Sequence, residues 1–225
     1  MSILYVVATP IGNLGDITQR ALDTFKLVDV IACEDTRHTL HLLTHFGIRK
    51  PLISCRSQNE KKAAAKIVEL LKKGQSVAYA SDAGTPALSD PGAVLVREVR
   101  EAGFTIVPLP GPSAFATLLS VSGGVDKSVI FEGFLSPKPG RRRSRVRELM
   151  ESGYAAVLYE SPFRIVKLLA DIAETDNDRR VIVGRELTKL HEEIVSGTAI
   201  AVFEDFSSRT KVKGEFSVYI SGKNA

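Results

Sequence analysis

Residues 4–16 read LYVVATPIGNLGD, an apolar run that changes abruptly into proline, glycine and asparagine. The apolar part predicts a buried β-strand over Ile3–Ala8. A glycine-rich turn directly after a strand is typical of a backbone that passes close to a ligand, and a nucleotide phosphate is the usual candidate. The G-x-G-x-x-G spacing is absent, however, because Gly12 and Gly15 stand three residues apart and Pro10 occupies the place of a first glycine.

The composition is that of a globular protein with one large or two small domains. The chain has 225 residues, of which 44% are hydrophobic and 25% charged, and a domain typically takes about 150 residues. No apolar run approaches the ~20 residues of a membrane-spanning helix, and the chain opens on strand-like sequence rather than on a signal peptide. Cys33 and Cys55 suggest neither a disulfide framework nor a metal cluster, which favours a reducing, cytosolic compartment.

Strand-like and helix-like segments alternate along the first half, which predicts right-handed crossovers and a largely parallel sheet. After the opening strand, strands are expected at Val30–Cys33, Leu52–Ser54, Ser76–Ala80, Thr105–Pro108 and Val129–Phe131. Helices are expected at Asp16–Leu27, Thr36–Phe46, Glu60–Lys73, Asp90–Ala102 and Ser113–Ser120. The stretch Gly133–Gly140, with two Gly and two Pro, predicts a linker.

Beyond this linker the alternation resumes. Strands are expected at Ala155–Tyr159, Val181–Arg185 and Glu215–Ser221, helices at Phe163–Ala173 and Ala199–Phe206, and a polar loop at Glu186–Glu193. We therefore expect an α/β protein with two α/β domains in series, residues 1–133 and 134–225, each with a central sheet flanked by helices. The cleft between two such domains is the natural place for a ligand.

Three Gly- and Pro-rich loops each follow a strand of the first half: TPIGNLGD (9–16), SDAGTPALSDPG (81–92) and PLPGPSA (108–114). Ligands of open α/β sheets bind at the carboxyl ends of strands, so three such loops favour a backbone-lined pocket over ordinary turns. The loops carry Asp16, Asp82 and Asp90 and no Lys or Arg. This argues against a nucleotide triphosphate and for a ligand with a cationic centre, such as S-adenosyl-L-methionine.

Seven motifs in one order make the whole chain resemble the tetrapyrrole-methylase-like (class III) methyltransferases. They are ATPIGNLGDITQRAL (8–22), CEDTRHT (33–39), SDAGTPALSDPG (81–92), PGPSA (110–114), FEGFL (131–135), YESPFR (159–164) and RELTKLHEE (185–193). Within this family, the resemblance is to the bacterial enzymes that methylate a cytidine ribose 2′-hydroxyl of 16S ribosomal RNA. It implies an S-adenosyl-L-methionine-dependent cytoplasmic enzyme and a homodimer, with RNA of the small ribosomal subunit as its partner.

The resemblance also implies a donor site. Pro10 and Gly12 would line the space between methyl donor and acceptor. The loop 81–92 is similar to the family element that carries the methionine end of the donor. The resemblance therefore assigns the donor to Ser81, Asp82, Ala83, Gly84 and Thr85, with Ser113 and Ala114 closing the site and Tyr159, Leu187 and Thr188 at the adenosine end.

Methylating a ribose hydroxyl requires alignment with the donated methyl group and removal of a proton. Candidates for the proton acceptor are Glu34, Asp35 and Glu160. Arg37 and Lys189 could hold a phosphate or polarise the ribose. A salt bridge that ties two loops together is the alternative role for each of these residues.

Basic residues crowd into Lys138–Arg147 in a chain of net charge +4 and isoelectric point about 9.1. Such a patch often binds a polyanion, so Lys138, Arg141, Arg142 and Arg143 are expected to contact RNA, with a solvated helix face as the alternative. Members of the family usually continue for several dozen residues past the last strand found here. RNA recognition is therefore expected to depend more on Arg141–Arg147 or on a partner subunit.

Two other functions compete with RNA methylation. A porphyrin or corrinoid C-methyltransferase of the same fold would not need the arginine run or the CEDTR and YESPFR motifs. A non-catalytic nucleotide-binding module would leave the carboxylates unexplained. His38, His41 and His45 are spaced three and four apart, but no Cys or carboxylate partner at a clear offset completes a metal site, so we expect a helix surface and no metal.

Overall fold

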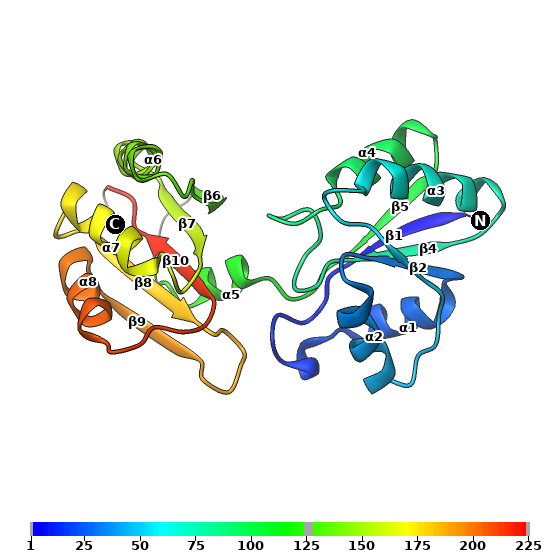
Figure 1. The fold of residues 1–225 in the computed structure, drawn as a ribbon, viewed down its shortest axis with the longest axis horizontal. Helices are drawn as coiled ribbons and strands as arrows, with labels where there is room; N and C mark the ends of the chain where they lie inside the picture. Colours follow the sequence, from blue (N-terminus) through cyan, green and yellow to red (C-terminus); the bar gives the residue numbers. More distant parts are fainter. Residues whose placement is uncertain (1, 124–127, 224–225) are drawn as a thin grey trace. The chain divides into compact units, whose positions relative to one another are not determined.

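The computed structural model describes residues 2–123 and 128–223, and the chain divides into two compact units, Met1–Ser113 and Ala114–Ala225. Each unit contains one five-stranded sheet with helices packed on it (Figure 1). The predicted α/β class, with two sheets flanked by helices, is confirmed. Within the described residues, no helix combines the length and the apolar character needed to cross a membrane.

The first unit is built on a parallel sheet. Its strands are β1 (Ile3–Val7), β2 (Val30–Cys33), β3 (Leu52–Ser54), β4 (Val77–Ala80) and β5 (Thr105–Leu109), in the order β3-β2-β4-β1-β5. Every residue of β2 and β4 is buried. Continuous burial without polar alternation is expected when helices cover both faces of a parallel sheet.

Two pairs of helices cover the faces of this sheet (Figure 1). One pair is α1 (Gln19–Leu27) and α2 (Thr36–His45), and the other is α3 (Glu60–Lys72) and α4 (Ala93–Glu101). Phe25 and Leu43 lie in the first core layer, and Ile67 and Leu95 lie in the second. A short 3₁₀ helix, η1 (Leu14–Asp16), precedes α1, which begins after Thr18 because the Thr18 side chain accepts a hydrogen bond from Ala21 N.

The second unit has a mixed sheet rather than a parallel one. Its strands are β6 (Val129–Phe134), β7 (Ala155–Glu160), β8 (Arg180–Arg185), β9 (Glu193–Thr198) and β10 (Phe216–Ile220), in the order β6-β7-β10-β8-β9. Only β6 and β7 are parallel, because β10 returns between β7 and β8 in the opposite direction. The helices are α5 (Ala114–Ser120), α6 (Pro139–Glu151), α7 (Ile165–Thr175) and α8 (Ala199–Ser208), of which α6, α7 and α8 share one core with the sheet.

Two predictions about the middle of the chain are wrong. The strand at Val129–Phe131 was expected to close the first half, but β6 pairs with β7 in the second sheet. The predicted linker Gly133–Gly140 instead contains the end of β6, where Gly133 with φ +69° follows a break in register, and the start of α6. Glycine also occurs at β-bulges and proline also occurs in the first turn of helices, so their presence here was wrongly interpreted as a linker. The boundary between the two units accordingly lies after Ser113 in the chain, whereas the sequence placed it after Gly133.

Strand β9 was not predicted. Its sequence EIVSGT alternates between half-buried and exposed residues at the edge of the sheet. An edge strand of this kind buries little apolar surface, so its hydrophobic signal is weak.

Candidate functional site

The loops that follow β1, β4 and β5 are joined by hydrogen bonds within the first unit. Thr9 and Gly84 exchange two backbone hydrogen bonds of 3.0 Å, and the Thr9 hydroxyl donates to Ser81 O at 3.1 Å. Thr85 Oγ1 donates to Pro112 O at 3.3 Å. The three strands are parallel neighbours in the sheet. Their loops therefore all leave from the carboxyl ends of the strands, where ligands of parallel sheets bind.

Two glycines allow these loops to approach one another. Gly84 has φ +77°, and a Cβ atom there would lie 3.3 Å from Ile11 Cγ2. A Cβ atom at Gly111 would lie 2.9 Å from the Cβ of Ala8. The turn after β1 therefore packs against the backbone of the loops after β4 and β5.

The loop after β4 is strained and firmly anchored. Ala87 and Ser89 have φ of 65° and 67°, in the left-handed region that side-chain-bearing residues seldom adopt. The buried carboxylate of Glu60 accepts hydrogen bonds of 2.9 Å from Gly92 N and of 2.9 and 3.1 Å from two further N–H groups in the first turn of α4. Strain that the surrounding structure holds in place is typical of ligand-binding loops.

The predicted donor residues of the first unit all lie on the joined loops. Pro10 and Gly12 follow β1, Ser81–Thr85 follow β4, and Ser113 follows β5. Ala114 is the first residue of α5 and belongs to the second unit.

Three carboxylates gather where β2 and β4 end. Glu34 follows β2, and Asp82 and Asp90 lie in the loop after β4. Burial raises the pKa of Asp90 to about 6, and the charges of Glu34 and Asp82 contribute to the rise. Burial also raises the pKa of Glu34, with Asp82 adding to the effect and Arg56 opposing it. A carboxyl group that titrates near neutrality beside like charges is suited to proton transfer.

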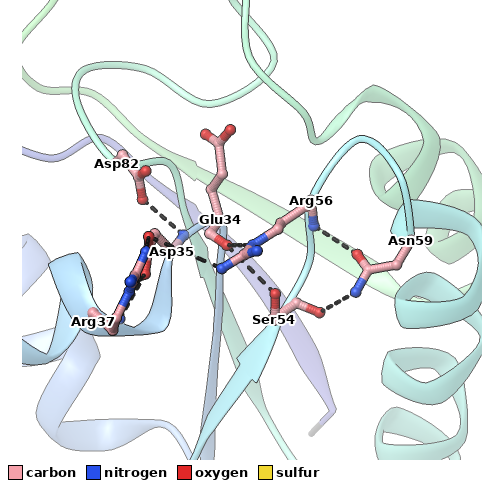
Figure 2. Close-up of polar contacts among 7 residues, drawn as sticks. All are labelled: Glu34, Asp35, Arg37, Ser54, Arg56, Asn59 and Asp82. Atoms are coloured by element: carbon pink, nitrogen blue, oxygen red, sulfur yellow. Dashed lines mark hydrogen bonds and ion pairs between the residues drawn. The ribbon is translucent and has the colours of Figure 1, made fainter.

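The segment after β2 is hydrogen-bonded to the loop after β4 (Figure 2). Asp82 Oδ1 accepts a hydrogen bond from Asp35 N at 2.9 Å, and Arg56 Nε donates to Glu34 O at 3.1 Å. The Glu34 carboxylate points away from these bonds. Asp35 is instead engaged by Arg37, whose Nε and Nη2 donate to it at 3.1 and 2.7 Å. Hydrogen bonds from the Arg37 side chain and backbone hold the pKa of Asp35 well below its usual range.

The residues predicted at the adenosine end lie in the second unit. The Tyr159 hydroxyl oxygen accepts a hydrogen bond from Phe115 N at 2.9 Å, and Leu187 is buried. Glu186 and Thr188 have φ of 49° and 68°, which is a true outlier for a β-branched threonine. Thr188 Oγ1 is buried, and no hydrogen-bond partner for it exists in the described part of the chain. A strained turn that carries a buried hydroxyl without a protein partner is a feature that functional loops often show.

Comparison with known proteins identifies the family. Residues 3–201 match the model of the Tetrapyrrole (Corrin/Porphyrin) Methylases. The chain belongs to this family.

Several relatives that this tetrapyrrole methylase matches over three quarters or more of their length share a name. The ribosomal RNA small subunit methyltransferase I of Borrelia garinii subsp. bavariensis is 47% identical over 97% of this chain and 98% of its own. The protein of that name from Thermotoga maritima is 45% identical over 99% and 100% of the two chains, and that from Bacillus subtilis is 42% identical over 100% and 76%. Among solved structures, the methyltransferase CobJ covers 99% of this chain and 95% of its own with a TM-score of 0.72 at 16% identity, which shows the common fold.

Glu160 of this methylase is an internal ion-pair residue. The residue is 1% exposed, and its Oε1 accepts from Ser161 N and lies 2.7 Å from Arg164 Nη2. Oε2 is buried and lacks a hydrogen-bond partner among residues 2–123 and 128–223. The structure therefore gives Glu160 the salt-bridge role that was the alternative to proton transfer.

The two predicted substrate-holding cations are both paired. Lys189 Nζ lies 2.9 Å from Glu186 Oε1 and 2.9 Å from Glu215 Oε2. Arg37 pairs with Asp35 at 2.7 Å, although 84% of its side chain is exposed. To bind a phosphate, each cation would have to interact with the phosphate and with its carboxylate partner at the same time.

The basic run of α6 divides into paired and unpaired residues. Arg142 is 4% exposed and donates from Nε to Asp171 Oδ2 on α7, and Arg143 Nε donates to Asp171 Oδ1 at 3.0 Å. The expected contact of Arg142 with RNA is therefore corrected, because a guanidinium buried against a carboxylate is not free to bind a phosphate. Lys138 and Arg141 are exposed and form no ion pair within the described residues.

In the described ranges, no group of three or more His, Cys, Asp or Glu side chains is placed to hold a metal ion. His38, His41 and His45 lie on α2. Cys33 and Cys55 are buried free thiols, and burial raises the pKa of Cys55 to about 12.

Proposed function

We propose that this protein is an S-adenosyl-L-methionine-dependent methyltransferase that modifies the ribose 2′-hydroxyl of a cytidine in small-subunit ribosomal RNA. The observation that carries the proposal is the bonded assembly of the loops after β1, β4 and β5, which presents backbone groups and carboxylates and contains no Lys or Arg. The relatives named ribosomal RNA small subunit methyltransferase I support ribosomal RNA as the substrate class.

The residues fit the charge of the proposed donor. Its sulfonium and amino groups are cationic, and Asp82, Asp90 and Glu34 supply negative charge at one end of the sheet. We assign the methionine end to Ser81, Asp82, Ala83, Gly84 and Thr85, the donor–acceptor space to Pro10 and Gly12, and the closing positions to Ser113 and Ala114. At the adenosine end we place Tyr159, Leu187 and Thr188, where the unused Thr188 hydroxyl is suited to a polar atom of the nucleoside.

The donor, when bound, supplies an electrophilic methyl group on a good leaving group. The chain must orient the 2′-hydroxyl and accept its proton. We propose Asp90 as the acceptor, because a group with a pKa of about 6 is ionised at neutral pH yet still basic, with Glu34 beside it. Asp35 is a weaker candidate because the hydrogen bonds from Arg37 lower its pKa. Glu160 is weaker because its charge is already committed to an internal ion pair.

We also propose that Arg37 and Lys189 help to hold the RNA, that the protein is a cytoplasmic homodimer, and that RNA is recognised within the small ribosomal subunit. Sedimentation of the purified protein tests the dimer. Comparing naked 16S ribosomal RNA with assembled subunits as substrates tests the last point.

The decisive experiment transfers a labelled methyl group to ribosomal RNA from a strain that lacks this gene, and then maps the modified atom. A single labelled cytidine 2′-oxygen supports the proposal. Donor binding without transfer would instead indicate a nucleotide-binding module, and transfer to a porphyrinogen but not to RNA would indicate a C-methyltransferase. The Gly74→Val variant is a folding control for the donor-loop variant Gly84→Val, because both glycines have positive φ and only Gly84 lies among the joined loops.

A further inference from the structure

We infer that the corner of the second unit formed by Phe134, Phe163, Lys138 and Arg141 binds an unpaired base of the RNA and its adjoining phosphates. This inference rests on the proposed function, since it assumes that RNA is the substrate. None of these side chains belongs to the donor loops. We refer to the four residues as the aromatic–basic corner.

The sheet places the two segments of this corner side by side. β6 and β7 are parallel neighbours, with Phe134 opposite Tyr159 in the register. The segments that follow the two strands therefore leave from the same edge. Arg164 Nη1 donates to Leu135 O at 3.3 Å and so bonds the segment after β7 to the segment after β6.

Two phenyl rings are exposed at this corner. Phe163 is 88% exposed and Phe134 is 55% exposed. The Phe134 ring lies edge to face against the Tyr159 ring, with 5.8 Å between the ring centroids, and more than half of the residue remains exposed. A large apolar side chain left almost wholly in water gains nothing from folding, whereas an exposed ring is a stacking platform for a nucleic acid base.

The Phe163 ring is presented on a rigid turn. Glu160 Oε1 binds both Ser161 N, at 2.7 Å, and Arg164 Nη2, at 2.7 Å, and Ile165 N donates to Ser161 O at 3.0 Å. The two ends of the turn are thus held by a buried carboxylate. Because the turn is already ordered, stacking on Phe163 would cost little conformational entropy.

The two cations of the corner form no ion pair within residues 2–123 and 128–223. Lys138 is the N-cap residue of α6, and Arg141 lies in its first turn. Their neighbours Arg142, Arg143 and Arg145 are held by Asp171 and Glu132. Helix N-termini also favour anions. Exposed rings interleaved with unpaired cations are the combination by which proteins bind single-stranded nucleic acid, which favours RNA over a protein partner.

The test uses the full chain and compares Phe163→Ala with Phe163→Tyr, and both with the double variant Lys138→Ala/Arg141→Ala. Because Phe163 is exposed, neither ring variant should alter folding. We expect Phe163→Ala to lower kcat/KM for ribosomal RNA by about fivefold to a hundredfold, mainly through KM, as loss of a base–aromatic stack does. Phe163→Tyr should retain activity. The double variant should reduce the salt dependence of RNA binding by a slope of roughly one to two. Donor affinity should not change in any variant.

A kcat/KM of Phe163→Ala within twofold of the parent would overturn the inference while leaving RNA methylation intact. A dimer that dissociates in Phe163→Ala would also overturn it, since the ring would then serve a second copy of the chain. Ultraviolet crosslinking to a single-stranded RNA 12-mer gives an independent readout, and the inference requires an adduct at Phe163 or Phe134. If the parent transfers no methyl group to RNA, the proposed function fails, and the crosslink still decides whether the corner binds RNA.

Discussion

Replacing either partner of the buried Arg142–Asp171 ion pair should destabilise the second unit, and the structure predicts which replacement costs more. The two side chains are 4% and 2% exposed. Removing one member of such a pair leaves the other charge buried, which typically costs roughly 3–5 kcal/mol. In Arg142→Ala, Asp171 keeps the bond from Arg143 Nε at 3.0 Å, so the loss should lie at the lower end. In Asp171→Ala, the Arg142 guanidinium remains buried without its carboxylate, so the loss should lie at the upper end.

The measurement is the free energy of unfolding from urea denaturation followed by circular dichroism. Arg141→Ala is the matched control, because Arg141 is an exposed neighbour on the same helix turn, and surface changes of this kind usually stay within about 0.5 kcal/mol. Arg142→Met retains much of the side-chain volume and so separates lost charge from lost packing. The reasoning is refuted if Arg142→Ala and Asp171→Ala are both as stable as Arg141→Ala. In that event Arg142 would return to the set of candidate RNA contacts.

Four further predictions concern three residues of the first unit, Gly84, Asp90 and Glu60. Gly84→Val should abolish S-adenosyl-L-methionine binding measured by calorimetry. The control Gly74→Val should bind the donor normally, because Gly74 has φ +88° and no atom lies within 4 Å of an added Cβ. Equal donor affinities of the two variants would show that the loop is not part of the site. Asp90→Asn should slow single-turnover methylation by ~10²–10⁴-fold, and the parent rate should rise with pH through about 6; a flat parent profile would exclude Asp90 as the base. Because folding raises the pKa of Asp90 from 3.8 to about 6, its ionised form opposes folding, so Asp90→Asn should be more stable than the parent at pH 8, with a gain that shrinks as the pH falls from 6 toward 4. Glu60→Ala should cost at least about 2 kcal/mol in thermal or urea unfolding, since it leaves buried N–H groups unsatisfied; a neutral effect would contradict the anchoring role.

Local sequence patterns predicted most of the first unit. Apolar runs such as Val30–Cys33 and Val77–Ala80 are buried on both faces, and the hydrogen bond from Ala21 N to the Thr18 side chain starts α1 through local chemistry alone. The three Gly- and Pro-rich loops were identified because each follows a strand, and their hydrogen bonds join them in the structure. Signals of this kind act over a few residues and therefore survive in a single sequence.

The features that sequence did not reveal depend on contacts between distant segments. Arg142 and Asp171 are 29 residues apart in the chain, so nothing near Arg142 distinguishes it from exposed Arg141. The raised pKa of Asp90 requires burial and the charge of Glu34, which comes from another strand. Gly133 and Pro139 are ordinary linker residues until the sheet shows that one follows a break in strand register and the other begins a helix.

Charge availability, rather than charge density, separates structural from functional residues in this protein. The most concentrated charges in the sequence are the arginine run and the CEDTR motif, yet Arg142 and Asp35 each form an ion pair, with Asp171 and with Arg37. When a charged group is already paired within the fold, binding a ligand exchanges one ion pair for another. The net gain in binding free energy is then small in water. A group held without a partner offers its full interaction. By that criterion Asp90, with its raised pKa, and exposed Arg141 are the better candidates for chemistry and for RNA binding, although the sequence pattern does not distinguish either residue from its neighbours.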